Sequence, residues 1–236
     1  MNISRKMQSR RDRLREWLQA NLRYFFYKLK YKNPGSPNKE LLVDVEAIKL
    51  AVNDRWLSRN HPEYKRLPKK INVIIFDDFW DHVEPLTDDY KVRGFHERFV
   101  ARRAWQDTTL FSYYKVKLMK GVKVQGCNNM DDLVRLYEER HDTLFERLKK
   151  EGIKSARGNY HITPIYVYIH QDGSLVYTSG GNHRLAMAKV LGIEKIPVRV
   201  RGRHVAWQVI RDELHDLGTV RFLIKYPALA GHPDLF

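Results

Sequence analysis

The stretch that most constrains the fold of this chain is 164–200. Two apolar runs, 164–169 and 175–177, lie on either side of a Gln-Asp-Gly-Ser turn, which predicts a β-hairpin. A Gly-Gly pair and an apolar-periodic segment follow, and the segment ends at Gly192, which predicts a loop and then a helix. The run 196–200 predicts a returning strand. Together these elements predict a compact unit of strands and helices.

The loop between the hairpin and the helix is rich in groups that bind anions. Small residues at a helix start expose backbone N–H groups at the positive end of the helix dipole, and an arginine adds a planar fork that matches phosphate oxygens. We therefore predict a phosphate-binding loop in which His183 also acts as a catalytic group. The predicted phosphate ligands are Ser179, Gly180, Gly181, Asn182, His183 and Arg184. Simpler interpretations stay open: His183 as a cap or core-edge residue, and Arg184 as a tie between loop and core.

Three aspartates follow a second predicted strand, the β-branched run at 71–76. Carboxylates at a strand end can hold a divalent cation or act as a general base. We predict Asp77 and Asp81 as ligands of Mg²⁺, and Asp78 and Asp81 as catalytic residues. The alternative is a solvated acidic turn.

The chain is strongly basic, with a formal net charge of +15 and a pI of about 9.8. Such a charge predicts a polyanionic partner: nucleic acid, an acidic membrane surface or a phosphorylated substrate. Arg201 and His204, after the returning strand, are further candidate anion contacts, with a solvated basic loop as the alternative. A single cysteine, Cys127, excludes an internal disulfide and a thiolate zinc cluster. With no secretory signal and no apolar run of the roughly 18 residues that span a bilayer, we expect a cytoplasmic protein.

Residues 1–32 hold ten Lys or Arg and only two acidic residues, and their pattern predicts an amphipathic helix. Its apolar stripe consists of Leu14, Trp17, Leu18, Leu22, Phe25, Phe26 and Leu29. Such a helix either rests on an anionic membrane surface, which would place the protein at the inner face of the membrane, or packs its stripe on the domain. Contact with nucleic acid or a partner helix is the remaining alternative.

The domain organisation follows from composition. We predict the helix at 1–32, a Pro- and Gly-containing linker at 33–38, and a single α/β domain at 39–236. Amphipathic patterns predict a helical insertion at about 85–155. The stretch 39–57 predicts a short helix or a helix followed by a strand.

Residues 162–200 resemble the nucleotide-binding core of the ParB/sulfiredoxin superfamily. The matching residues are Gly181, Asn182, His183 and Arg184 in the loop, then Leu191, Gly192, Ile196, Pro197 and Val198. The resemblance implies an α+β fold, with a mixed sheet and flanking helices, whose loop holds nucleotide phosphates together with Mg²⁺. The implied nucleotide is ATP, or else ADP or CTP.

Three branches of this superfamily differ at the loop and beyond it. Sulfiredoxins carry a catalytic cysteine where this chain has Asn182, and ParB partition proteins add a DNA-binding domain for which 201–236 is too short. Free serine kinases carry an Asp-Gly-His-His-Arg loop, which Gly181, His183 and Arg184 match in part. The chain also resembles uncharacterised ParB-like proteins of bacteria and archaea.

The expected function is therefore that of an ATP- or ADP-dependent, kinase-like phosphotransferase. It would transfer a phosphoryl group to a hydroxyl of a small or lipid-linked substrate near the membrane surface, which requires a positioned metal and base. The alternative is a non-enzymatic module that binds nucleotides or nucleic acid through the +15 charge. A third possibility is a phage-type protein that keeps the fold without catalysis.

Overall fold

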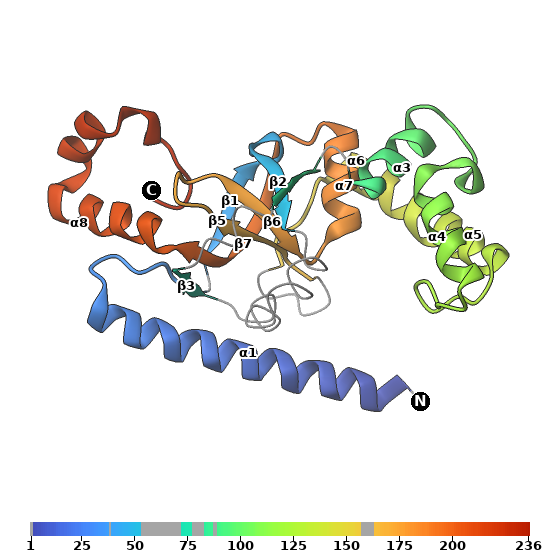
Figure 1. Cartoon of the computed structure of the whole chain (residues 1–236), viewed down its shortest axis with the longest axis horizontal. Coiled ribbons are helices and arrows are strands. Elements are labelled where there is room, and N and C mark those ends of the chain that lie inside the picture. The colour runs from blue at the N-terminus through green and yellow to red at the C-terminus, as the bar shows by residue number, and fades with distance from the viewer. Residues whose placement is uncertain (1, 38, 53–71, 77–82, 87–88, 157–162) are drawn as a thin grey trace.

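A computed structural model describes residues 2–37, 39–52, 72–76, 83–86, 89–156 and 163–236, with side chains from Leu14 onward. The described chain has a seven-stranded mixed sheet at its centre and helices at its flanks (Figure 1). This confirms the predicted mixed sheet with flanking helices, while the ParB/sulfiredoxin assignment stays a prediction. None of the helices described is both long and hydrophobic enough to cross a bilayer.

The sheet is built around its longest strand, β7. The strands are β1 (Glu40–Asp44), β2 (Ile48–Val52), β3 (Val73–Ile75), β4 (Val83–Pro85), β5 (Ile165–Ile169), β6 (Leu175–Ser179) and β7 (Lys195–His204). Their order is β1-β7-β5-β6-β2-β4, and β3 pairs with the far end of β7. β7 is parallel to β5 and β3, and β2 is parallel to β6, while the remaining pairs are antiparallel.

Helices flank this sheet on three sides in the view of Figure 1. They are α1 (Asn2–Lys30), α3 (Tyr90–Phe99), α4 (Thr109–Met119), α5 (Met130–Tyr137), α6 (Thr143–Glu151), α7 (Asn182–Leu191) and α8 (Val205–Lys225). A π-helical turn, Glu138–Asp142, joins α5 to α6, where the sequence predicts one amphipathic helix. α8 has a kink at Gly218, whose backbone angles are not helical, and the helix then continues to Lys225.

The hairpin, the loop and the helix after it form as predicted. β5 and β6 pair antiparallel, and the Asp172 carboxylate between them accepts the backbone N–H of Ser174 at 2.8 Å. Gly173 in the same turn has φ 88°, which suits glycine. α7 ends at Gly192, whose φ of 62° is that of a left-handed C-terminal residue.

Two stretches differ from their predictions. In the stretch 39–57, the described residues 39–52 form β1 and β2 joined by a short 3₁₀ turn. Leu41 and Val43 alternate with more exposed residues and are buried in the core of the sheet, as a strand requires. Residues 53–57 lie outside the described part of the chain. The returning strand does not end at Val200 but continues to His204, because its last residues pair with β3. Strand pairing between distant segments sets both outcomes.

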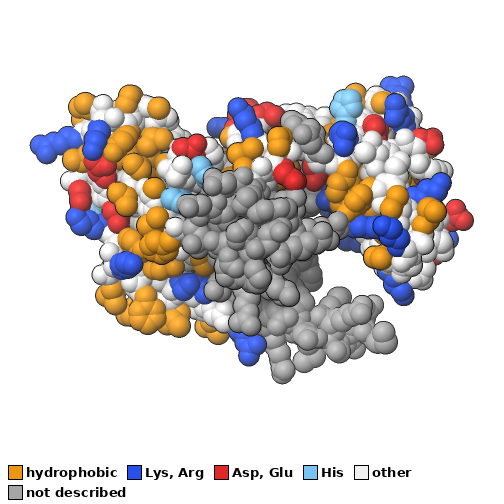
Figure 2. Space-filling view, in the orientation of Figure 1, with side chains coloured by type: hydrophobic (Ala, Val, Ile, Leu, Met, Phe, Trp, Pro, Cys, Tyr) orange, Lys and Arg blue, Asp and Glu red, His pale blue; other side chains and the backbone are white. Residues whose placement is uncertain are grey.

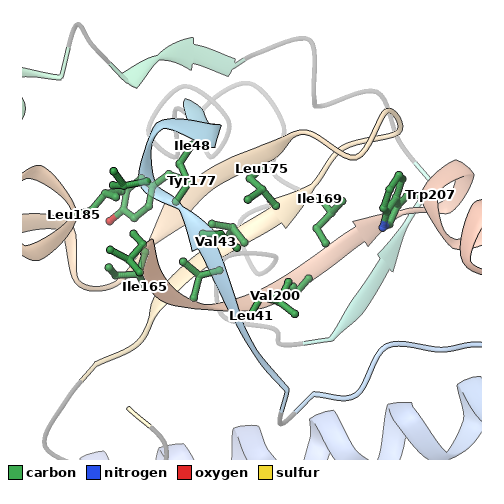
Figure 3. Close-up of a cluster of buried hydrophobic side chains, with 14 of the residues drawn as sticks. Leu41, Val43, Ile48, Ile165, Ile169, Leu175, Tyr177, Leu185, Val200 and Trp207 are labelled. Carbon is green, nitrogen blue, oxygen red and sulfur yellow. The ribbon is translucent and has the colours of Figure 1, made fainter. Parts of the chain in front are cut away.

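The hydrophobic core has two main parts, and α7 lies between them. One face of the sheet packs on α7 and α8 through a cluster that includes Ile165, Val200, Leu185 and Trp207 (Figure 3). A second cluster joins α3, α4, α5 and α6 to the other side of α7, where Met187 is fully buried. The start of α7 is therefore held between the sheet and the helices at 90–151.

Candidate functional site

The loop before α7 requires glycine at two successive positions. Gly180 and Gly181 have φ of 74° and 53°, in the left-handed region. A Cβ atom on Gly180 would lie 2.2 Å from the carbonyl oxygen of Pro164 and 3.1 Å from the Tyr166 ring. On Gly181 it would lie 2.6 Å from the side chain of Ile165. The loop backbone is thus packed so closely against the start of β5 that a side chain at either position would clash with it.

The start of α7 has no side-chain cap. Gly181 occupies the cap position and makes no side-chain hydrogen bond, and Asn182 is the first helical residue. The first N–H groups of a helix have no partner within the helix, and they carry the positive end of its dipole. An anion at this point would therefore meet unused backbone donors.

Arg184 ties the loop to the chain before β5. Its guanidinium donates a hydrogen bond to the carbonyl oxygen of Thr163. Burial lowers the pKa of Arg184, and the nearby charge of Arg147 lowers it further. The structure thus shows the tie between loop and core that the sequence left open, while the phosphate contact of Arg184 stays a prediction.

His183 points away from the loop, into the helices at 90–151. Its Nε2 atom lies 3.1 Å from the Tyr137 hydroxyl and 3.4 Å from Nε2 of Gln125, and its ring centroid lies 4.6 Å from that of His141. Burial lowers the pKa of His183 to about 3, helped by the charges of His141 and Lys91. The imidazole is therefore neutral at physiological pH, so its predicted roles in phosphate binding and catalysis would use an uncharged ring.

A group of polar side chains lies beside the loop on the other face of the sheet. Tyr166 on β5 has two register partners, Ser179 on β6 and Arg199 on β7. The guanidinium carbon of Arg201 lies 4.2 Å from the centre of the Tyr166 ring. Neighbouring strands are only about 4.8 Å apart, so these side chains form one patch. We call Tyr166, Ser179, Arg199 and Arg201, together with Thr178 next to Ser179 in the β-bulge of β6, the arginine patch.

Four polar atoms of the arginine patch are buried without a hydrogen-bond partner. They are Oγ1 of Thr178, Oγ of Ser179, and Nε of Arg199 and of Arg201. Arg201 is 8% exposed, and neither arginine forms an ion pair with a carboxylate of the described chain. A buried charge without a counter-charge is costly, and buried polar atoms are normally paired. The patch therefore has the donors that an anion with several oxygens would satisfy.

Electrostatics at Tyr166 show which charges surround the patch. Burial raises the pKa of Tyr166, Arg201 and Arg199 lower it, and Glu16 of α1 raises it. The net shift is upward, so the phenol is neutral and can donate a hydrogen bond at physiological pH. Because Glu16 acts on this hydroxyl, α1 runs along the same face of the sheet as the patch.

Of the two further anion contacts that the sequence predicts, only Arg201 joins the patch. His204 ends β7, and its Nδ1 atom accepts the backbone N–H of Ala206 at 3.1 Å, which caps α8. Cap formation explains its position without an anion. The prediction that both follow the returning strand is wrong, because both belong to β7, and this also excludes the alternative of a basic loop.

The predicted carboxylate site lies outside the described residues. This holds for Asp77, Asp78 and Asp81, so their metal-binding and catalytic roles stay predictions. Within the described part of the chain, no group of three or more His, Cys, Asp or Glu side chains is arranged to hold a metal ion.

Sequence reasoning missed Arg199, Thr178 and Tyr166. A signal for Arg199 was present, because basic residues alternate with valines from Val198 to Arg201, which places both arginines on one face of a strand. Thr178 and Tyr166 gave no such signal, since a lone hydroxyl in an apolar strand is common.

Comparison of the chain with protein-family models, with curated proteins and with solved structures finds no match. The resemblance to the ParB/sulfiredoxin superfamily therefore stays a prediction that rests on the loop, the helix and the returning strand. The arginine patch and the adjoining loop are the features of the structure that point to a function.

Proposed function

We propose that this protein binds a nucleotide through its phosphates and acts as a kinase-like phosphotransferase on a hydroxyl of a small or lipid-linked substrate. One observation carries the binding part: four unpartnered buried polar atoms, two of them on arginines, lie beside a glycine loop and an uncapped helix. The transfer part rests on the resemblance of the loop at 180–184 to that of the free serine kinases.

The residues present fit a phosphate group. Arg199 and Arg201 would neutralise its charge, and their planar forks suit pairs of phosphate oxygens. The hydroxyls of Thr178 and Ser179 would donate to further oxygens. The main role of Arg184 would be to hold the loop in place through its hydrogen bond to Thr163, with phosphate binding as a secondary role. When bound, the nucleotide supplies the phosphoryl group, and Mg²⁺ on Asp77 and Asp81 would offset its charge.

Nucleotide binding is tested by thermal unfolding of the full chain with ATP, ADP, CTP or inorganic phosphate, each with and without Mg²⁺. A ligand that binds only the folded state adds about 2.7 kcal/mol at a hundredfold excess over its Kd, so we expect a rise in Tm of several degrees with at least one nucleotide. Arg201→Met should abolish the rise. Arg221→Met, which removes an exposed arginine from α8, is the matched control and should keep it.

Two results would contradict the binding proposal: no rise in Tm with any nucleotide, or an equal rise in the Arg201→Met variant. Steeply salt-dependent binding to generic DNA that survives Arg201→Met would instead favour the nucleic-acid module.

Phosphoryl transfer needs its own measurement. Asp78 is the predicted catalytic carboxylate that is not also a predicted metal ligand. We expect Asp78→Asn to leave the nucleotide-dependent rise in Tm unchanged and to remove release of ADP or AMP in the presence of hydroxyl acceptors. If the wild-type chain binds nucleotide and turns over none of it with any acceptor, the protein is a nucleotide-binding module without transferase activity.

A further inference from the structure

Helix α1 packs on the rest of the chain with the face opposite to its apolar stripe. All seven stripe residues remain between 49% and 75% exposed, with Trp17 at the lower limit and Leu29 at the upper. Figure 2 shows hydrophobic side chains along the lower left rim, where the C-terminal half of α1 runs. The stripe is therefore not used to build the fold.

The inner face of α1, opposite the stripe, is the one that faces the sheet. Ala20 is 2% exposed, and the Tyr27 hydroxyl accepts the backbone N–H of Ile74 in β3 at 3.2 Å. Burial also lowers the pKa of Arg23, and Glu16 acts on the hydroxyl of Tyr166. Three of these inner positions, 16, 20 and 27, follow a stripe residue by two, which is about 200° around a helix. The two faces are thus nearly opposite.

An exposed apolar stripe of this kind is typical of a binding surface, and the charge of the helix distinguishes a second copy of the chain from an anionic lipid surface as its partner. Residues 1–32 carry ten basic and two acidic residues, and Arg15 and Lys28 are exposed beside the stripe. A second copy of the chain would bring an equally basic helix against the first, which like-charge repulsion opposes. An anionic surface would be attracted, and Trp17, Phe25 and Phe26 have the side chains that favour a lipid interface.

We infer that α1 docks in the plane of an anionic lipid bilayer, with its stripe buried at the boundary between headgroups and acyl chains. Lys and Arg beside the stripe contact the lipid phosphates and strengthen the attraction to the surface. Because α1 also runs along the face of the sheet that carries the arginine patch, docking turns this face toward the bilayer. The inference does not require nucleotide binding and stands if that proposal fails.

The test is co-sedimentation of the full chain with phosphatidylcholine vesicles, with and without phosphatidylglycerol. We expect binding only when phosphatidylglycerol is present, and weaker binding at high salt. Combining Phe25→Ser with Phe26→Ser should weaken binding at least about tenfold, because it removes two large apolar groups from the interface. Both side chains are more than half exposed, so this variant should unfold at the wild-type temperature.

The matched control combines Val220→Ser with Ile224→Ser, which removes exposed apolar side chains from α8. These residues are 74% and 78% exposed, and their loss should leave vesicle binding unchanged. Trp17 gives a second readout, because its fluorescence emission should shift to the blue when vesicles are added. The contribution of Trp17 is obtained by subtracting the emission of the Trp17→Phe variant from that of the wild type. The inference is overturned by equal sedimentation of the α1 variant and wild type, by no binding of wild type, or by stripe-dependent dimerisation in sedimentation velocity.

Discussion

Strand β7 carries buried and half-buried arginines in two opposite settings. Arg203 meets a carboxylate, that of Asp234, with Nη2 to Oδ1 at 2.5 Å and Nε to Oδ2 at 2.8 Å. Arg199 and Arg201, on the same strand, form no ion pair with a carboxylate of the described chain, although Glu40 is the register partner of Arg199 and Glu16 acts on nearby Tyr166. One strand thus carries both an arginine in a buried ion pair and two arginines outside any ion pair of the described residues. The first arrangement stabilises the fold, and the second is a site that an anionic ligand would complete.

The neutralised arrangement joins three distant parts of the chain. Asp234 also accepts a hydrogen bond from Nε1 of Trp207 at 3.0 Å and forms an ion pair with Arg211. Arg211 in turn donates to the carbonyl oxygen of Asn33 at 3.0 Å, in the segment after α1. Burial alone would raise the pKa of Asp234, but Arg203 and Arg211 outweigh burial and hold the pKa well below its usual range.

The largest effect should come from breaking the neutralised arrangement. Asp234→Asn leaves two buried guanidiniums without a counter-charge, and we expect a loss of about 3–5 kcal/mol of unfolding free energy in urea. Asp216→Asn is the control, because the Asp216–Lys32 pair is exposed to solvent and should contribute little to stability. Similar losses in the two variants would show that the buried network does not stabilise the fold.

Lowering the pH should reduce the unfolding free energy through the buried histidines before it affects the Asp234 network. Burial, with the charge of Arg140, lowers the pKa of His141 to about 4. Burial, with the charges of His141, Lys91 and Arg140, lowers the pKa of His183 to about 3. Both groups have a pKa near 6.5 in the unfolded chain, so their contribution is complete above that pH and is lost as pH falls toward 4 and 3. We expect stability to fall by roughly 2 kcal/mol or more between pH 7 and pH 5, while Asp234 stays ionised.

Chemical unfolding at a series of pH values measures this loss. His141→Phe replaces one titrating ring with an aromatic ring in an aromatic surrounding, and it should make the dependence shallower. His215→Gln, at a side chain that is 59% exposed, should leave the dependence as it is. An unchanged pH dependence in His141→Phe would assign the acid sensitivity to other groups.

The smallest effect should come from the two arginines that form no ion pair within the described chain. Arg201→Met removes a buried charge and keeps a long apolar side chain, so we expect the ligand-free protein to keep its stability or gain about 1 kcal/mol. The same change at Arg203 should be destabilising, because it leaves the Asp234 carboxylate under-neutralised. A loss of stability in Arg201→Met comparable to that in Arg203→Met would remove the distinction between the two arrangements.

The parts of the fold that the sequence predicts well are local. The turn at Asp172, the glycine loop and the end of α7 depend on residues next to one another in the chain, and all three form as expected. The extent of β7 depends on pairing with β3, which lies more than a hundred residues earlier, and the sequence missed it. The direction of His183 is likewise set by Tyr137 and the helices around it.

The α1 helix shows the same division between local and distant causes. Its spacing predicts an amphipathic helix, and hydrophobicity alone favours burial of the apolar stripe. In the tertiary structure, the backbone N–H of Ile74 donates a hydrogen bond to Tyr27 on the opposite face of the helix. The stripe residues remain exposed, so the face that carries Tyr27 lies inward.

By itself, the sequence determined the local elements of this protein, its basic charge and the loop chemistry that suggests phosphate. Only the tertiary structure decided which buried arginines are neutralised. Arg201 and Arg203 stand two residues apart with the same chemistry, and nothing local separates them. They differ because the chain returns an aspartate, Asp234, to one of them from 31 residues further on.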